Sequence, residues 1–389
     1  MTTTINNEHN KLNVPNLRFP EFQGEWEEYR IEDITENISS GKCKSHSSNG
    51  EYNLYGSTGI IGKTDEACYE GNLVLVARVG ANAGFLQIIN EPCGITDNTL
   101  IIKPQKVGAQ YIYYYLQHFN LNRLIFGSGQ PLITGGMLKK VKVSLGNIQE
   151  QNKLTRLLSL LDERIATQNK IIDKLQSLIK GLEDKILDNS LWEKTYLRSF
   201  MQFFSTNSLS WEQLSYEEGE IRNLHYGLIH GFQTRGINSA SLPMIKNEAI
   251  PKQYTLCQVG DVAFADASED TSEIAKSVEF VDTIEGDTVC GLHTIHGRDV
   301  KDRTVVGFKG FAFNSRYFHN QIKRLAQGTK VFSITANNLS SCYVYLPDVE
   351  TQKVIVKLLK AYEEQLIISR MTLKQYEKQK QYLLLQMFI

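Results

Sequence analysis

Residues 154–186 read LTRLLSLLDERIATQNKIIDKLQSLIKGLEDKI, and residues 355–387 read IVKLLKAYEEQLIISRMTLKQYEKQKQYLLLQM. In the first stretch leucine or isoleucine recurs at steps of four and three residues, interrupted by Gln168. This spacing is a heptad seam, which predicts a long helix that packs against another helix. The second stretch keeps the pattern, and its polar residue at the matching position is Ser369. Each helix alone would expose an apolar stripe, so we expect the two to pack on each other.

The predicted seam is defined by residues that share one face of each helix. They are Leu154, Leu158, Leu161, Ile165, Gln168, Ile172, Leu175, Ile179 and Leu182 in the first helix, and Ile355, Leu359, Tyr362, Leu366, Ser369, Leu373 and Leu383 in the second.

Outward from the helices, the chain repeats itself at a constant offset of 201 residues, as in the pairs Thr134 and Thr335, and Gln151 and Gln352. Each copy runs from an alternating stretch through a short cap into a long helix. Asn147 and Asp348 stand where N-caps belong. Glu150 supplies the acid of a capping box in the first copy only.

The direction of the helix pair follows from the order of the repeat. An antiparallel pair places the two preceding units at opposite ends and gives the repeat an approximate two-fold axis. Gln168 and Ser369 then fall near that axis, where a polar layer could fix the register. The open alternative is that both side chains face solvent at a break in the seam.

The whole chain of 389 residues is therefore predicted to be α+β, with two strand-rich domains in tandem, each followed by a long helix, and the two helices forming an antiparallel coiled coil. The expected boundaries are a flexible tail 1–16, a first domain 17–146, a central helix 147–190, a second domain 191–346 and a final helix 347–389. We expect strands at 73–79, 99–102 and 141–145, at 261–265, 304–308 and 342–346, and short helices at 109–119 and 315–325.

Composition excludes several classes of protein. There is no apolar run long enough for a membrane span, and residues 1–11 lack the apolar core of a secretory signal. Six cysteines contain no CxxC pair, so reduced thiols in a cytoplasmic protein are expected rather than a zinc site or a disulfide framework. The formal net charge of −1 excludes a uniformly basic DNA coat.

Charge is nevertheless sorted along the chain. Residues 98–149 carry six basic groups and no acid. Residues 298–330 carry eight basic groups and two acids. Basic surfaces at matched places of a two-fold repeat suit duplex DNA. A helix of about 40 residues spans roughly 60 Å. Two recognition units at the ends of such a pair predict a bipartite target with an uncontacted gap.

Motifs of catalysis are incomplete. Residues 56–64 (GSTGIIGKT) resemble a P-loop but place five residues, not four, before the Gly-Lys pair. Cys290, His293 and His296 are spaced like metal ligands but lack a fourth partner of suitable spacing. No carboxylate arrangement suggests a nuclease. The sequence predicts a protein that reads a target rather than an enzyme.

Several segments resemble the specificity (S) subunits of type I restriction–modification systems. They are 17–22 (LRFPEF), 55–62 (YGSTGIIG), 71–80 (GNLVLVARVG), 126–134 (FGSGQPLIT), 221–230 (IRNLHYGLIH), 260–266 (GDVAFAD) and 382–388 (YLLLQMF). Their order along nearly the whole chain, together with two helical seams, carries the resemblance.

The resemblance implies that each strand-rich domain is a target recognition domain reading one half of a split DNA sequence. It also implies that the helices set the spacing and dock two modification subunits, which methylate adenine with S-adenosylmethionine. Two restriction subunits would add translocation and cleavage with Mg and ATP. On this basis the chain itself holds no cofactor and no metal, and its direct partners are double-stranded DNA and these subunits.

Chemistry selects the candidate DNA contacts, because Arg and Lys recognise guanine and Asn and Gln recognise adenine, and because recognition loops sit in turns on a rigid scaffold. The predicted base-contacting residues are Lys42, Lys44, Tyr55, Ser57, Arg78, Asn82, Ser128 and Gln130 in the first domain, and Tyr226, His230, Arg235, Asp266, Ser268, His293 and Lys330 in the second. The predicted phosphate contacts are Lys103, Arg123, Lys139, Lys142, Arg316, Lys323 and Arg324. Residues 267–271 are acidic where the first domain has residues 79–83 (VGANA), so the two loops differ in chemistry.

Two other functions remain open at this point. One is a DNA-binding regulator linked by a coiled coil that acts without enzymatic partners. The other is an adaptor that binds protein rather than DNA. Steep salt dependence of DNA binding distinguishes the first from the second.

Overall fold

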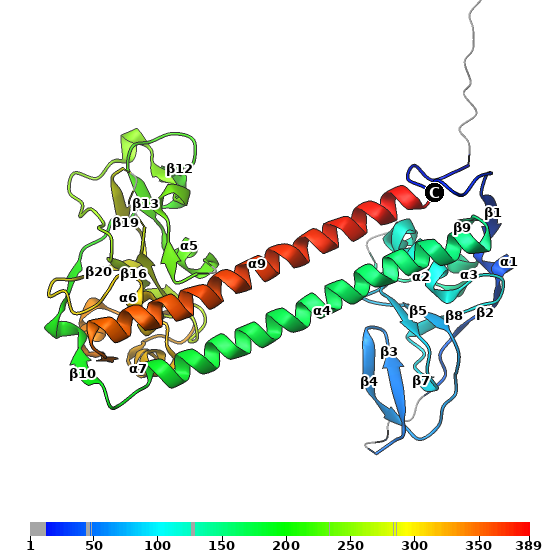
Figure 1. Cartoon of the computed structure of the whole chain (residues 1–389), viewed down its shortest axis with the longest axis horizontal. Coiled ribbons are helices and arrows are strands. Elements are labelled where there is room, and N and C mark those ends of the chain that lie inside the picture. The colour runs from blue at the N-terminus through cyan, green and yellow to red at the C-terminus, as the bar shows by residue number, and fades with distance from the viewer. Residues whose placement is uncertain are drawn as a thin grey trace, which may run out of the picture. The chain divides into compact units, whose positions relative to one another are not determined.

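The computed structural model describes residues 13–43, 47, 49–125, 129–232, 234–282, 284 and 286–389, and these form two compact units. Unit 1 contains the described residues up to Gln168 together with Thr372–Ile389, and unit 2 contains Asn169–Met371. Each unit combines a strand-rich α+β domain with parts of two long helices, α4 (Ile148–Leu187) and α9 (Val349–Met387) (Figure 1). Two strand-rich regions, each followed by a long helix, confirm the predicted element order. The two helices have 40 and 39 residues and lie inside the predicted spans 147–190 and 347–389.

Unit 1 is built from three small sheets. The pairs and orders are β1-β9, β2-β8-β5-β6 and β4-β3-β7. The elements are β1 (Glu27–Arg30), α1 (Ile31–Ile34), β2 (Thr35–Ser40), β3 (Tyr52–Gly56), β4 (Gly59–Thr64), β5 (Leu73–Ala77), β6 (Leu86–Ile89), β7 (Cys93–Ile95), β8 (Thr99–Pro104), α2 (Ala109–Phe119), α3 (Gly135–Lys139) and β9 (Lys142–Leu145).

Unit 2 repeats this plan with additions. Its sheets are β10-β22, β11-β20-β16-β18-β14, β12-β15-β13-β19 and β17-β21. Its first elements are β10 (Glu193–Tyr196), β11 (Met201–Phe204), β12 (Leu214–Ser215), β13 (Arg222–Leu224), α5 (Tyr226–Gly231), β14 (Gly236–Ile237), β15 (Met244–Ile245) and β16 (Val262–Ala265). The later ones are β17 (Ala267–Ser268), β18 (Ser277–Phe280), β19 (Thr288–Cys290), β20 (Thr294–Asp299), α6 (Phe308–Ala312), α7 (Arg316–Leu325), β21 (Phe332–Ser333), α8 (Ala336–Ser341) and β22 (Tyr343–Leu346).

The first and last strands of each domain pair with each other immediately before the long helix. β1 lies antiparallel to β9, and β10 lies antiparallel to β22. The chain therefore closes each domain and enters the helix within three residues. Asn147 Oδ1 accepts the N–H of Glu150 and Asp348 Oδ1 accepts the N–H of Thr351, both at 2.9 Å, so both predicted N-caps are confirmed.

The repeat extends to side chains at the helix starts. Gln151 donates to the carbonyl of Gly146 at 2.8 Å, and Gln352 donates to that of Pro347 at 3.0 Å. Both glutamines are buried. Each one ties the first turn of its helix to the short link that follows the last strand of its domain.

The core of each unit includes one end of both long helices. In unit 1, Leu154 and Leu158 of α4 share a cluster with Leu384 and Met387 of α9. In unit 2, Leu187 of α4 shares a cluster with Ile355 and Leu359 of α9, packed against Leu182 and Ile186. Within each unit, then, the start of one helix lies beside the end of the other.

The predicted seam faces inward. All the residues by which the seam was defined are buried or half-buried. Ser369 is 3% exposed and Gln168 is half-buried, so the alternative in which both face solvent is wrong for Ser369. The end of α9 is anchored in unit 1, where Phe388 packs edge-on against Tyr111 at 5.4 Å. No described helix has the length and apolar character that a membrane span requires.

Two local predictions are wrong. Residues 304–308 are not a strand but lead into α6; the strand lies earlier, as β20. The N–H and the hydroxyl of Thr304 both donate to the carboxylate of Asp299, and these two bonds turn the chain there instead. The carboxylate of Glu150 does not close a capping box, because it binds Arg18 at 2.7 and 2.8 Å and the indole N–H of Trp26 at 3.1 Å. The other strands and both short helices are confirmed within two residues at each end.

Replacement of Glu150 tests how strongly this contact holds the N-terminal segment onto the helix. The Glu150 side chain is 2% exposed, and its removal leaves a partly buried guanidinium and an indole N–H without their partner. We expect Glu150→Ala to lower the free energy of unfolding of unit 1 by about 3 kcal/mol. Urea unfolding measures it. Glu163→Ala, on the same helix and in the same unit, in an exposed ion pair with Arg156, is the matched control and should change it by less than about 1 kcal/mol. Equal effects of the two would contradict this account.

Candidate nucleic-acid interface

Four loops of unit 1 meet at the end of β5. The N–H of Arg78 donates to Asn98 at 2.9 Å, and its carbonyl accepts the N–H of Ile133 at 2.8 Å. Gly80 donates to Pro131 at 3.0 Å, and the hydroxyl of Ser57 donates to the carbonyl of Asn98. The structure thus brings the predicted residues Ser57, Arg78 and Gln130 to one place. We call this hydrogen-bonded junction, around Arg78, the loop platform of unit 1.

Other predicted residues of unit 1 lie differently. Lys42 and Asn82 are exposed, whereas Lys44 and Ser128 fall outside the described residues. The hydroxyl of Tyr55 donates to Glu91 at 2.6 Å, and burial together with this carboxylate raises the pKa of Tyr55 to about 12. Tyr55 therefore stays neutral and is held by Glu91. The P-loop-like segment is the β3–β4 hairpin, in agreement with the expectation that it is not a phosphate loop.

Unit 2 has the same junction at the end of β16. The N–H of Asp266 donates to the carbonyl of His293 at 3.0 Å, and the carbonyl of Asp266 accepts the N–H of Ile334 at 3.0 Å. Asp266 therefore occupies the position of Arg78, and His293 that of Asn98. We call this junction the loop platform of unit 2. The backbone hydrogen bonds are the same in both units, but the side chain at this position is the cation Arg78 in unit 1 and the acid Asp266 in unit 2.

Aromatic side chains extend the second platform. The ring of Tyr226 lies edge-on to that of His293 with centroids 5.2 Å apart, and His293 Nδ1 is 3.1 Å from Asp266 Oδ1. His225 lies between Tyr226 and Trp211, at centroid distances of 4.8 and 4.5 Å. Burial, with His293 nearby, lowers the pKa of His225.

Sequence reasoning identified Tyr226 and His293 but missed Trp211 and His225. Trp211 is 45% exposed. A signal was available, because tryptophan is rare in this chain and an exposed ring offers a stacking surface for a base. Nothing in the sequence placed it beside His225, from which it is separated by 14 positions and by the two strands β12 and β13.

The remaining predicted residues of unit 2 do not all join this platform. His230 contacts Tyr226 edge-on and lies 3.4 Å from Glu273. Ser268 is half-buried in β17, and Lys330 is exposed. Arg235 lies elsewhere, between two carboxylates of the long helices. It reaches Glu183 at 3.2 Å and Glu363 at 3.3 Å, so its guanidinium holds the domain to α4 and α9.

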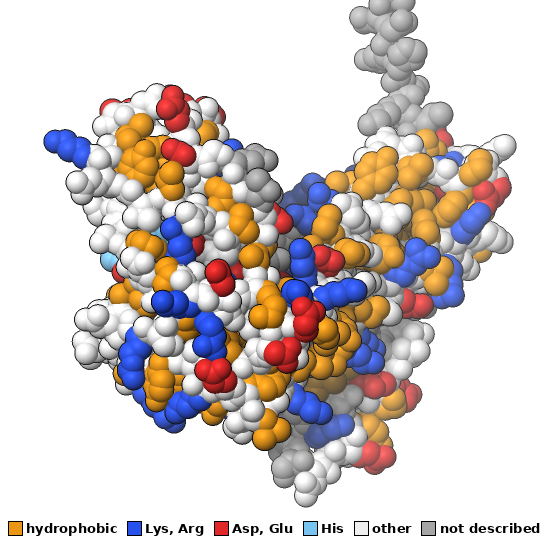
Figure 2. All heavy atoms as spheres, turned by 60° about the vertical axis from the view of Figure 1, so that its left-hand side comes forward, with side chains coloured by type: hydrophobic (Ala, Val, Ile, Leu, Met, Phe, Trp, Pro, Cys, Tyr) orange, Lys and Arg blue, Asp and Glu red, His pale blue; other side chains and the backbone are white. Residues whose placement is uncertain are grey.

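All seven predicted phosphate contacts are exposed. Three of them form ion pairs: Lys103 with Glu36, Lys142 with Glu28 and Arg316 with Asp184. Such exposed pairs are weak and do not prevent a phosphate from replacing the carboxylate. On the face of unit 2 that comes forward in Figure 2, lysine and arginine side chains form several separate groups with acidic side chains between them. The basic surface is therefore broken up, unlike that of a uniform DNA coat.

A polar cavity of about 780 Å³ lies in unit 2 beside Arg235. Its walls come from α4, α7, α9 and the loops near β14 and β18, and they carry Lys180, Arg316, Lys323 and Arg370 as well as Glu183 and Glu363. Glu363 is 8% exposed, and its burial raises the pKa of its carboxyl to about 7 despite Arg235.

Comparisons with known proteins agree with this architecture. A family model described as the type I restriction modification DNA specificity domain matches residues 23–177 and 300–377. The type I restriction enzyme MjaVIII specificity subunit of Methanocaldococcus jannaschii is 25% identical over 96% of this chain and 93% of its own.

Two solved structures share the fold. The S subunit of a type I restriction-modification system from M. genitalium superposes with a TM-score of 0.62 at 16% identity, over 97% of this chain and 99% of that one. A chain from a study of complex assembly and conformational transition of the type I R-M system gives a TM-score of 0.55 at 11% identity, over 92% of this chain and 96% of that one.

The raised pKa of Glu363 predicts a pH dependence of stability. A carboxyl whose pKa is higher in the folded state binds its proton more tightly there, so its stabilising contribution is full below the unfolded pKa of about 4.3 and is lost as pH rises through about 7. Relative to Glu363→Gln, the wild-type free energy of unfolding should fall between pH 5 and pH 8 by as much as roughly 3 kcal/mol.

Denaturant unfolding at the two pH values measures this difference. Glu364→Gln, the exposed neighbour on the same helix, is the control and should keep the wild-type pH dependence. A Glu363→Gln variant that follows the wild type at both pH values would show that Glu363 is ionised throughout.

Proposed function

The chain belongs to the type I restriction modification DNA specificity domain family, and from this premise we propose that its two units read the two halves of a split DNA target. It is the DNA sequence-specificity subunit of a type I restriction–modification complex. It selects the sequence and performs no catalysis itself. The observation that supports one half-site for each unit is the duplicated loop platform, which has the same backbone hydrogen bonds but different side chains in the two units.

In this proposal unit 1 reads its half-site with Arg78 and Gln130. Arginine recognises guanine through two hydrogen bonds, and glutamine recognises adenine in the same way. Arg78 is suited to this role because its Nε is buried without a hydrogen-bond partner in the protein. A base edge would satisfy this donor once the half-buried side chain turned toward it.

Unit 2 reads the other half-site with a different chemistry. Asp266 can accept from cytosine, while Tyr226, His293 and Trp211 offer rings for apolar contact and stacking. Because Asp266 stands where Arg78 stands in unit 1, the two half-sites should differ in sequence. The exposed cations, among them Lys139 and Arg324, would position the duplex through its phosphates.

The long helices would set the distance between the half-sites. We propose that α4 and α9 run antiparallel along their seam as a coiled coil. This is supported by the contacts inside each unit, where the start of one helix lies beside the end of the other. Their outer faces would dock two modification subunits carrying S-adenosylmethionine, and two restriction subunits would add Mg- and ATP-dependent steps. The chain would then act inside the cell, where its target DNA is.

Substitutions on the two platforms should relax specificity in one half-site each. We expect Arg78→Ala to weaken discrimination at one base pair of the first half-site, and His293→Ala at one base pair of the second. A lost base contact of about 1–3 kcal/mol corresponds to roughly 5- to 150-fold. Selection of bound duplexes from a random library, with the chain assembled with its modification subunit, measures both.

The controls separate specificity from folding and charge. Tyr216→Ala changes an exposed ring of unit 2 outside the platform and should leave both half-sites intact. Lys139→Ala should weaken binding to every sequence and reduce the salt dependence. If Arg78→Ala and His293→Ala alter the same half-site, or neither alters any, the assignment of one unit to each half-site is wrong.

A further inference from the structure

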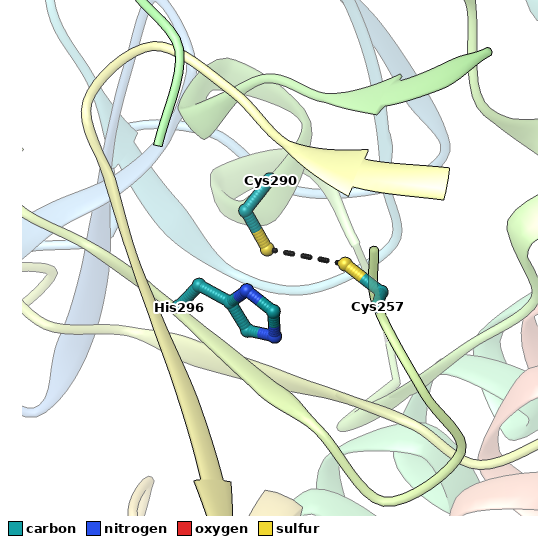
Figure 3. A group of neighbouring side chains, drawn as sticks. All are labelled: Cys257, Cys290 and His296. Carbon is teal, nitrogen blue, oxygen red and sulfur yellow. Dashed lines mark hydrogen bonds between the residues drawn. The ribbon is translucent and has the colours of Figure 1, made fainter. Parts of the chain in front are cut away.

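A buried group of metal-ligand side chains lies in unit 2, apart from the loop platform. Cys257 precedes β16, Cys290 ends β19 and His296 lies in β20. Their ligand atoms all lie within 4.8 Å of one another, and the two sulfurs are 3.6 Å apart. The residues are 6%, 3% and 1% exposed. Figure 3 shows the two thiols pointing toward each other, with one nitrogen of the histidine ring turned toward Cys290.

The second nitrogen of this ring is held by a carboxylate. His296 Nε2 is 2.7 Å from Asp261 Oδ2, and Asp261 is itself bound by Arg298 at 2.7 and 2.8 Å. An ionised carboxylate only accepts, so Nε2 carries a proton, and Nδ1 is the nitrogen whose lone pair is available in the neutral ring. Metal-binding histidines are oriented in this way by a carboxylate on the other nitrogen.

Unit 1 shows that the fold does not need these polar groups. Cys257 donates its N–H to Thr288 in unit 2 as Tyr69 does to Cys93 in unit 1. Cys290 pairs with Leu224 in unit 2 as Ile95 pairs with Tyr55 in unit 1, so Cys290 corresponds to Ile95. The pairing of the next strands likewise makes His296 correspond to Ile101. By the same alignment Asp261 matches Leu73.

The four matching residues of unit 1 pack together as an apolar cluster. Leu73, Ile95 and Ile101 are among its buried members, together with Leu75, Ile89 and Cys93, and Tyr69 packs against them. The same place in unit 2 therefore holds two thiols, an imidazole and a carboxylate instead of four apolar or aromatic side chains. Four correlated polar replacements in a buried position indicate a ligand rather than repacking.

We propose that unit 2 binds a zinc ion through Cys257, Cys290 and His296. Thiolate and imidazole ligands are those that zinc prefers. Two sulfurs bonded at about 2.3 Å to one tetrahedral ion lie roughly 3.8 Å apart, close to the distance in this cluster. Binding releases two protons from the thiols, and the ion with two thiolates and a neutral imidazole has no net charge, which suits a buried position. A water molecule completes the four ligands.

The ion would join two sheets of unit 2. Cys290 belongs to the sheet of β13 and β19, and His296 belongs to the sheet of β16 and β20. The short loop between these two ligands carries His293, whose backbone is in the left-handed region with φ of 54°. Zinc would thus fix both ends of the loop that presents His293. The metal site itself does not depend on the proposed function, because its ligands are outside the platform.

Metal content of the full chain, purified under reducing conditions after growth with zinc, tests the proposal. We expect one zinc per chain by elemental mass spectrometry. Replacement of zinc by Co²⁺ should give the thiolate-to-cobalt absorption band and the visible bands of a tetrahedral site. This spectrum is measured on the wild-type chain, so it does not depend on whether any variant folds.

Substitutions then identify the ligands. Cys257→Ser, Cys290→Ser and His296→Gln should each reduce zinc from one per chain to a small fraction, and Asp261→Asn should weaken zinc affinity about 10- to 100-fold. Cys342→Ala is the matched control, because Cys342 is a buried cysteine of the same unit outside the cluster, and it should keep the zinc.

Three results would overturn the proposal. The first is a wild-type chain without stoichiometric zinc and without the thiolate-to-cobalt band. The second is zinc that disappears with Cys68→Ser in unit 1, where the sulfurs of Cys43 and Cys68 are 2.8 Å apart, but persists without Cys257. The third is a Cys257–Cys290 disulfide found by peptide mapping of the freshly isolated chain.

Discussion

The structure depends on the pairing of the first and last strands of each domain directly below a long helix. β1 with β9, and β10 with β22, close the domain at the residue where the helix begins. Buried Gln151 and Gln352 then fasten the first helical turn to the short link that follows the last strand. Because only two residues separate the last strand from the helix, and hydrogen bonds hold both of them, each helix leaves its domain without a long linker. A specificity subunit needs this property, since an uncontacted gap in the target must have a fixed length.

The long helices and the repeat could be predicted from the sequence because both are written in local patterns. Leu154, Leu158 and Ile355 recur with heptad spacing, and Asn147 and Asp348 cap the helices through contacts only three residues long. Glu150 could not be assigned correctly, because its partners Arg18 and Trp26 lie more than 120 positions away. The predicted strand at 304–308 failed because Thr304 binds the carboxylate of Asp299 and turns the chain, Val306 stays exposed and Phe308 already begins α6.

The candidate site was predictable only in part. Turns rich in glycine pointed to Arg78, Gln130 and His293, and the structure brings each of these to a loop platform. Arg235 was chosen by its position in a turn and its residue type, but tertiary contacts commit it to Glu183 and Glu363. The cysteine spacing gave no metal motif, because Cys257 joins Cys290 and His296 only through sheet pairing. Duplication with divergence explains why the platform and the metal-ligand group differ between the copies. The backbone is kept, while Arg78 and Ile101 of unit 1 correspond to Asp266 and His296 of unit 2.

The central claim is that one chain reads two half-sites with two related but different domains. Mapping of N6-methyladenine in host DNA, with and without the chain and its modification subunit, tests this most directly. The account predicts a chain-dependent mark at a split motif with two unlike half-sites and a fixed gap. A mark at a single uninterrupted motif, or no mark from a soluble assembled complex, would contradict it.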